Sequence, residues 1–202
     1  MRITHSTSRR GINDEGFDRS DPDRRDLHPW GLCLPHALAG KKPTTTALDA
    51  VEASHLTFMR EEEKLARDVY LKLDEIWGGA TQTFANIAVS EQEHTDAVKA
   101  LLDKYGVEDL AIVEDGKLVP GEFHDEELQE LYETLVANGE EGLIEALNVG
   151  VTIEKKDMDD IADAIDLSRR YPDIVKVYSN LLAGSESHLA GFLEALEQAE
   201  DD

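Results

Sequence analysis

Apolar side chains recur at alternating steps of three and four residues in four separate stretches of the chain. The stretches cover residues 56–77, 84–105, 147–164 and 174–195. Steps of three and four place side chains along one face of an α-helix. The pattern therefore predicts four amphipathic helices that turn their apolar faces toward a common core.

Each apolar stripe is interrupted by an acidic residue or a histidine. An isolated polar residue can fix the register of a packed bundle, and this plain structural interpretation remains the alternative. A polar interruption in every stripe is costly unless something positive lies between them. The pattern therefore indicates a bundle built around metal. The predicted ligands are Glu63, Glu91, His94, Glu154, Asp157 and His188.

Turn signals give the order of the helices. Helices are expected over 48–76, 81–106, 141–167 and 172–199. Short connections make the first two helices, and likewise the last two, antiparallel neighbours. Residues 106–140 are long enough to cross the bundle, and Asp115-Gly116 between short apolar runs predicts a hairpin. A short extra helix is expected over 125–137. The predicted fold class is all-α, a ferritin-like four-helix bundle with one long crossover that carries a small β-hairpin and this short helix.

The six predicted ligands can meet at one depth in such a bundle. Each lies roughly 15–25 Å from an end of its helix, at a rise of about 1.5 Å per residue. Residues placed only to set register would have no reason to share a level.

The first 48 residues have a different composition from the rest. They contain four of the six prolines and a stretch of mixed charge over 18–26, without an amphipathic period. This composition predicts a disordered tail over 1–48, followed by the helical domain over 49–202.

Charge and cysteine content exclude several classes of protein. The formal net charge is −24, which argues against nucleic-acid binding. No apolar run approaches the ~20 residues of a membrane span, and no signal peptide is expected. One cysteine, Cys33, excludes an intramolecular disulfide framework and a four-cysteine iron site. The sequence thus predicts a soluble, cytoplasmic protein without a membrane partner, and it leaves a homodimer open.

The predicted cluster has a charge that two metal ions would balance. Four buried carboxylates would cost many kcal/mol or take up protons, whereas two divalent ions supply four positive charges. Carboxylates with imidazoles favour iron, manganese or zinc over calcium, and the absence of thiolates disfavours copper(I) and iron–sulfur clusters. The sequence therefore predicts two metal ions of this group as the cofactor.

The segment Glu91-Gln92-Glu93-His94, together with Glu63, resembles the ferritin-like di-iron proteins, especially the rubrerythrin branch. The stretch from Met59 to Leu189 is similar to the family known as domain of unknown function 2202 (DUF2202). The ferritin-like resemblance implies one carboxylate on the first and third helices, and Glu-x-x-His on the second and fourth. The sixth place falls on Ser185, and we expect Asp157 to replace the missing carboxylate.

The resemblance implies that the cofactor is two iron ions, with manganese or zinc as alternatives, and that this centre reacts with dioxygen or hydrogen peroxide. An oxidase or peroxidase of this type needs a separate electron donor or free ferrous iron, because the chain has no Cys-x-x-Cys module. A non-catalytic protein that binds or buffers iron, and a structural bundle with a metal-stabilised core, are the alternatives. Whether the chain is an enzyme is therefore left open.

Several residues near the ligands have plainer interpretations. Glu61, Glu62 and Glu93 lie off the stripes and are expected to be solvated. Tyr70 and Tyr178 are expected to be core residues whose hydroxyls need a partner, with a redox role as the alternative.

Overall fold

A computed structural model describes residues 47–201 of the chain. This part of the chain is all-α apart from one small hairpin, as the sequence predicts. The prediction of a disordered tail concerns residues that lie almost entirely outside the described range. The helices and strands are α1 (Ala50–Trp77), α2 (Thr83–Tyr105), β1 (Val113–Glu114), β2 (Lys117–Leu118), α3 (Glu126–Gly139), α4 (Leu143–Leu167) and α5 (Pro172–Asp201).

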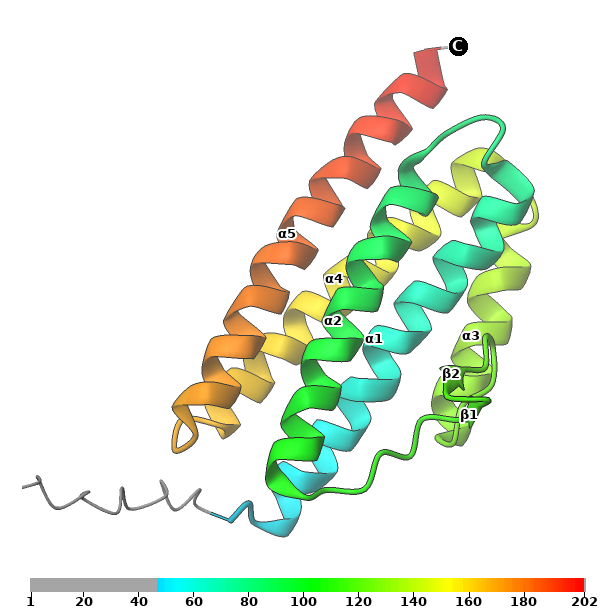
Figure 1. Ribbon diagram of the computed structural model, residues 1–202. Helices are drawn as coiled ribbons and strands as arrows, with labels where there is room; N and C mark the ends of the chain where they lie inside the picture. Colours follow the sequence, from blue (N-terminus) through cyan, green and yellow to red (C-terminus); the bar gives the residue numbers. More distant parts are fainter. Residues whose placement is uncertain (1–46, 202) are drawn as a thin grey trace, which may run out of the picture. The chain divides into compact units, whose positions relative to one another are not determined.

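The four long helices lie side by side (Figure 1). Helix α1 packs against α2 and α4, and α5 packs against the same two helices, so the four close a ring. Helix α3 lies against α1 and α4. The connection from α2 to α4 carries both the hairpin and this shorter helix, as predicted.

Local chemistry explains where the elements begin and turn. The Asp49 side chain accepts hydrogen bonds from the first backbone N–H groups of α1, and Asp125 does the same for α3. The hairpin turns at Asp115 and Gly116, which both have positive φ, 50° and 76°. Two consecutive residues with positive φ match the twist of a two-residue hairpin, and glycine adopts this conformation at little cost.

The connection between α2 and α3 is held to α1 by buried charged groups. The Glu61 carboxylate accepts the backbone N–H groups of His124 and Asp125 at 2.7 and 3.1 Å. Lys64 donates to Asp68 at 2.6 Å and to the carbonyl of residue 122 at 3.0 Å. These contacts hide most of one charged face of α1 from solvent.

The prediction that Glu61 and Glu62 are solvated is therefore wrong, since both are buried. Glu62 forms an ion pair with Lys156 of α4. The stripe pattern identified the face of α1 that meets the other long helices, but it carried no information about the segment that covers another face. Glu93 is exposed, as expected.

Buried apolar side chains form two clusters, one around Tyr70, Phe84 and Phe192 and the other around Leu102 and Ile161. Each long helix contributes to both clusters, with polar residues between the two contributions. These buried polar residues share one level, as the helical depths predicted. We call them the polar layer: Glu63, Glu91, His94, Glu154, Asp157, Ser185 and His188.

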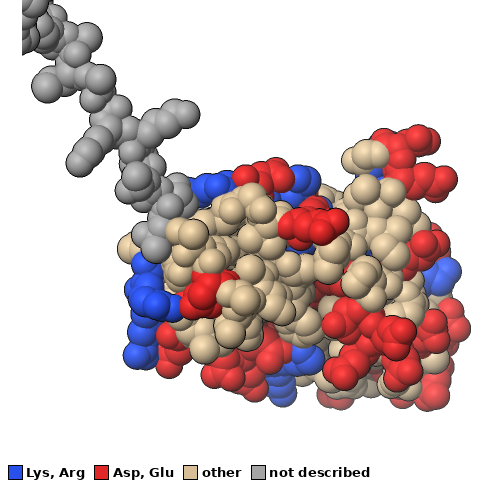
Figure 2. Space-filling model, turned by 90° about the horizontal axis from the view of Figure 1, so that it is seen from below, with Lys and Arg blue, Asp and Glu red and all other residues tan. Residues whose placement is uncertain are grey.

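The outer surface reflects the acidic composition. On the face in Figure 2, Asp and Glu side chains are widespread, with fewer Lys and Arg among them. Within residues 47–201, no helix combines the length and the apolar character needed to cross a membrane.

Candidate metal centre

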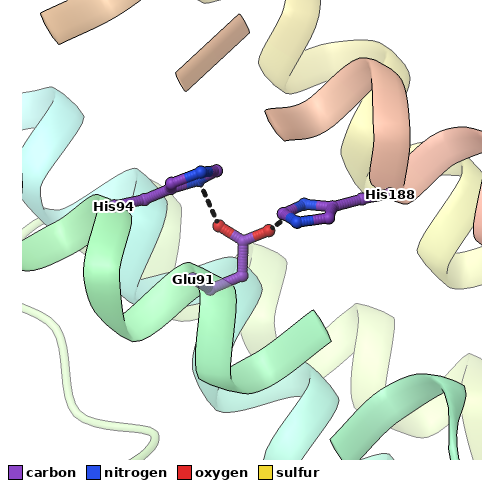
Figure 3. Close-up of side chains that lie close together, drawn as sticks. All are labelled: Glu91, His94 and His188. Atoms are coloured by element: carbon purple, nitrogen blue, oxygen red, sulfur yellow. Dashed lines mark hydrogen bonds and ion pairs between the residues drawn. The ribbon is translucent and has the colours of Figure 1, made fainter. Parts of the chain in front are cut away.

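Glu91 lies between the two histidines of the polar layer (Figure 3). Its Oε2 atom is 2.9 Å from Nδ1 of His94, one turn along α2, and its Oε1 atom is 2.7 Å from Nδ1 of His188 on α5. The imidazole rings face each other with centroids 5.3 Å apart. The three side chains offer ligand atoms that all lie within 4.8 Å of one another. The structure thus brings together three of the predicted ligands around one carboxylate.

Two further carboxylates flank this trio. Glu63 of α1 places Oε2 3.3 Å from Nδ1 of His94. Glu154 of α4 places Oε2 3.6 Å from Nδ1 of His188. Each histidine nitrogen therefore faces Glu91 on one side and a second carboxylate on the other, so the arrangement is nearly symmetric about Glu91.

Asp157 lies next to the position where the resemblance implied a missing carboxylate. The Ser185 hydroxyl donates to Asp157 Oδ2 at 2.5 Å, and both side chains are buried. The Asp157 carboxylate is also close enough to Glu63 and Glu91 for their charges to raise its pKa. The aspartate thus reaches the serine across the α4–α5 interface, and its role as the replacement ligand stays a prediction.

Residues outside the predicted ligand set orient the layer. The Tyr70 hydroxyl donates to Glu154 Oε1 at 2.6 Å, which supplies the partner expected for this core tyrosine. The Ser90 hydroxyl lies 2.9 Å from Nε2 of His188. Ser90 precedes Glu91 directly, and its role could not be read from the stripe pattern because it is a small polar residue off the stripe.

Within the described residues, several buried polar atoms of the layer have no hydrogen-bond partner: both carboxylate oxygens of Glu63, Oε1 of Glu91 and Nδ1 of His188. The Tyr178 hydroxyl, in the neighbouring apolar cluster, has none either. Glu91 Oε1 and His188 Nδ1 are nevertheless only 2.7 Å apart, so the two groups form an ion pair when the imidazole is protonated. A buried polar atom without a partner is costly, and native proteins leave few of them. Buried carboxylate oxygens that lie beside imidazole nitrogens without a full set of hydrogen bonds fit coordination of a cation.

The electrostatics of the layer also fit a cation. Within residues 47–201, only histidines form ion pairs with the four carboxylates. Burial raises the pKa of Glu63 to about 8, and the nearby Glu91 charge adds to this shift. Burial and the neighbouring Glu63 and Glu91 charges also hold the pKa of Asp157 well above its usual range. The layer thus carries more acidic groups than its two imidazoles can neutralise.

The pKa values of the two histidines are shifted by the same nearby carboxylates. Burial alone would lower the pKa of His94, but Glu63 and Glu91 outweigh it and raise that pKa to about 10. Glu154 and Glu91 likewise raise the pKa of His188 to about 9 against the effect of burial. Protons therefore occupy the imidazoles when no other cation is bound, and a metal ion would have to displace them.

Gly184 allows His94 to take its place in the layer. A Cβ atom at residue 184 would lie 2.4 Å from His94 Nε2 and 2.6 Å from Cε1. We expect Gly184→Ala to push the ring aside, to destabilise the protein by about 1–3 kcal/mol, and to weaken metal binding roughly 10- to 100-fold. Thermal unfolding of the metal-free protein and calorimetric titration with zinc or manganese would measure the two effects.

Gly191 provides the matched control, one heptad further along α5. The nearest atom to a Cβ at that position would be Ile87 Cδ1, at 3.9 Å. Gly191→Ala is expected to stabilise the helix by about 1 kcal/mol, because a helical glycine is replaced without a clash. Equal effects of the two substitutions would show that the Gly184–His94 contact does not constrain the ring.

An open cleft of about 360 Å³ lies between α2 and α5 and reaches His188. Polar side chains line much of it, among them Asn86, Ser187, Glu194 and Gln198. Water and small polar solutes can therefore approach the histidine side of the polar layer.

Comparisons with known proteins give one family and one relative. The family model described as "Uncharacterized protein domain (DUF2202)" matches residues 52–201. The uncharacterized protein MJ0754 of Methanocaldococcus jannaschii is 45% identical over 145 residues, covering 72% of this chain and 75% of the relative. The crystal structure of hypothetical protein MJ0754 from the same source superposes with a TM-score of 0.71 and 42% identity, covering 77% of this chain and 85% of that one.

Proposed function

This chain belongs to the DUF2202 family, and we propose that it is a ferritin-like protein that holds two metal ions, in the first place iron, in its polar layer. We further propose that the loaded centre reacts with dioxygen or hydrogen peroxide. The observation that carries the proposal is the position of Glu91. Its two oxygens face Nδ1 of His94 and Nδ1 of His188, at 2.9 and 2.7 Å.

The arrangement of the helices supports the ferritin-like assignment. Two antiparallel helix pairs are joined by one long crossover, which is a recognised topology of four-helix bundles with carboxylate-bound metals. Glu91 and His94 supply the Glu-x-x-His pair of that group on α2. On α5 the corresponding glutamate position is occupied by Ser185, so Asp157 takes over the carboxylate from α4.

The contacts suggest how the ligands divide between two ions. Glu63 and His94 would hold one ion, Glu154 and His188 the other, and Glu91 would contact both. Asp157 adds the fourth carboxylate. Two divalent ions would then balance four buried negative charges without help from lysine or arginine.

When bound, two ferrous ions would supply two electrons in all. Together with two protons, these electrons would reduce dioxygen to hydrogen peroxide, or hydrogen peroxide to two molecules of water. The chain's own residues position and insulate this centre. Tyr70 holds Glu154 through a 2.6 Å hydrogen bond, and Ser185 holds Asp157. The apolar clusters above and below the layer exclude water from those two sides, so that water approaches through the cleft at His188. A separate reductant would return electrons to the centre, since the described helices contain no thiol pair.

Anaerobic loading with ferrous iron, followed by desalting and metal analysis, tests the proposal directly. We expect about two iron ions per chain, as in dinuclear carboxylate bundles. One ion per chain would show that the Ser185 departure has disabled half of the centre. No bound iron in a folded protein would make the layer a structural polar network and remove the redox function. Large assemblies with many irons per chain would instead identify a storage protein.

A further inference from the structure

A second cavity approaches the polar layer among α1, α3 and α4. This is the side of the helix ring opposite the cleft between α2 and α5. Its volume is about 40 Å³. Most of its wall is apolar, formed by Leu65, Ala66, Leu128, Leu131, Leu135 and Ile153. We call it the apolar pocket.

The residues that line the apolar pocket differ in exposure. Lys156 has 45% of its side chain exposed, and forms an ion pair with the buried Glu62. Asp157 is only 5% exposed and belongs to the polar layer. The pocket is therefore bordered both by a surface side chain and by a proposed metal ligand.

The volume limits what the pocket can hold. A cavity needs roughly 10–15 Å³ to accept one water molecule, whereas pockets for drug-sized ligands measure roughly 300–1,000 Å³. At about 40 Å³, the apolar pocket is much closer to the volume needed for one water molecule than to that of a pocket for a drug-sized ligand. It has room for a molecule of a few heavy atoms and excludes larger organic substrates.

The apolar wall further limits which small molecules the pocket can bind. Hydrogen peroxide loses hydrogen bonds to water when it enters an apolar space, and that loss is unfavourable unless new partners replace them. Aliphatic side chains offer none. Dioxygen has no hydrogen bonds to lose, and small apolar cavities lined by leucine and isoleucine readily take up apolar atoms and molecules of its size.

We propose that the apolar pocket is a binding site for dioxygen, which reaches the polar layer past Asp157. This inference rests on the proposed function and deepens it, because it selects dioxygen as the oxidant admitted from this side. Polar molecules, hydrogen peroxide included, approach through the opposite cleft, where Asn86, Ser187 and His188 supply hydrogen-bonding groups.

Xenon tests the pocket without any metal. We expect the metal-free full-length protein to give a saturable ¹²⁹Xe chemical-shift change during titration with dissolved xenon. Ala66→Val, which adds two methyl groups to the α1 wall, should abolish the saturable change. Leu131→Phe should do the same from the α3 wall, and Leu131→Ala, which widens the same position, should preserve it. Absence of saturable xenon binding by the parent protein would overturn the proposal.

Reaction rates of the ferrous-loaded protein test the role of the pocket. Narrowing by Ala66→Val or Leu131→Phe should slow the reaction with dioxygen roughly tenfold or more, the usual effect of a methyl-sized misfit in an apolar site. Leu131→Ala should not slow it. The reaction with hydrogen peroxide and the iron content should stay unchanged in all three variants. Unchanged dioxygen rates in both narrowed variants would overturn the proposal.

The two readouts separate this proposal from the one on which it rests. A protein that binds xenon but no iron would overturn the metal centre, and with it the role of the pocket in an oxidation. A protein that binds about two irons but no xenon would retain the metal centre and overturn the pocket.

Discussion

Glu91→Gln is expected to remove both metal ions from the protein. Within residues 47–201, the Glu91 carboxylate is the only one that forms ion pairs with both His94 and His188, at 2.9 and 2.7 Å. Glutamine keeps the size of the side chain but replaces one oxygen by an N–H donor, which cannot coordinate a cation, and removes the negative charge. Iron per chain should therefore fall from about two to nearly none. The metal-dependent gain in stability, about 4 kcal/mol with ion at a thousand times its Kd, should vanish with it.

Metal analysis and calorimetric unfolding, each with and without added ion, measure these two effects. Glu93→Gln is the matched control, because Glu93 lies on the same helix and is exposed. It should retain both ions and the full metal-dependent stabilisation. If Glu91→Gln also bound two ions with the affinity of the parent protein, Glu91 could not be the shared ligand.

The metal-free protein is expected to lose stability steadily between about pH 5 and pH 10. The pKa of Glu63 is raised to about 8 in the folded state. Between the ordinary glutamate pKa and about 8, the folded state therefore binds more protons than the unfolded state, and the free energy of unfolding falls as pH rises. The pKa values of His94 and His188 are raised to about 10 and 9. The stability that these two histidines contribute is fully present below the ordinary histidine pKa. It is lost as pH rises through their raised pKa values.

Bound metal should reverse this trend. Imidazole and carboxylate must lose their protons before they coordinate an ion, so metal binding releases protons and strengthens as pH rises. The increase in Tm on adding manganese or zinc should therefore be small near pH 6 and large near pH 9.

Calorimetric scans at both pH values, in low and high salt, provide the measurement and its control. Salt at about 1 M shortens the screening length to about 3 Å, which suppresses repulsion among the surface carboxylates but hardly affects buried groups. A metal-free Tm that no longer depends on pH in high salt would assign the effect to the acidic surface instead of the polar layer.

Much of the helical architecture follows from the spacing of apolar residues. The stripes and the turn signals together placed the four long helices within a few residues of their observed bounds, and Asp115-Gly116 identified the hairpin. The common level of the polar residues followed from helical rise alone, because connections within each helix pair are short. That argument needs no knowledge of side-chain contacts.

Contacts between segments that are distant in the sequence could not be predicted in the same way. Glu61 is buried because it binds the backbone of residues 124 and 125, more than sixty positions away in the sequence. The approach of Asp157 to Ser185 and of Gly184 to the His94 ring depends on the distances between helices. Periodicity identifies which face of a helix is buried, whereas these contacts depend on how closely two faces meet.

The ring of four long helices divides the six proposed ligands equally between two halves of the chain. Helices α1 and α2 carry Glu63, Glu91 and His94, and α4 and α5 carry Glu154, Asp157 and His188. Each half can form early from contacts that are local in sequence, since both are simple helical hairpins. The complete ligand set exists only after the halves dock. In the proposed centre, acquisition of metal would therefore act as a checkpoint on assembly, because a half that has not docked offers only three of the six proposed ligands.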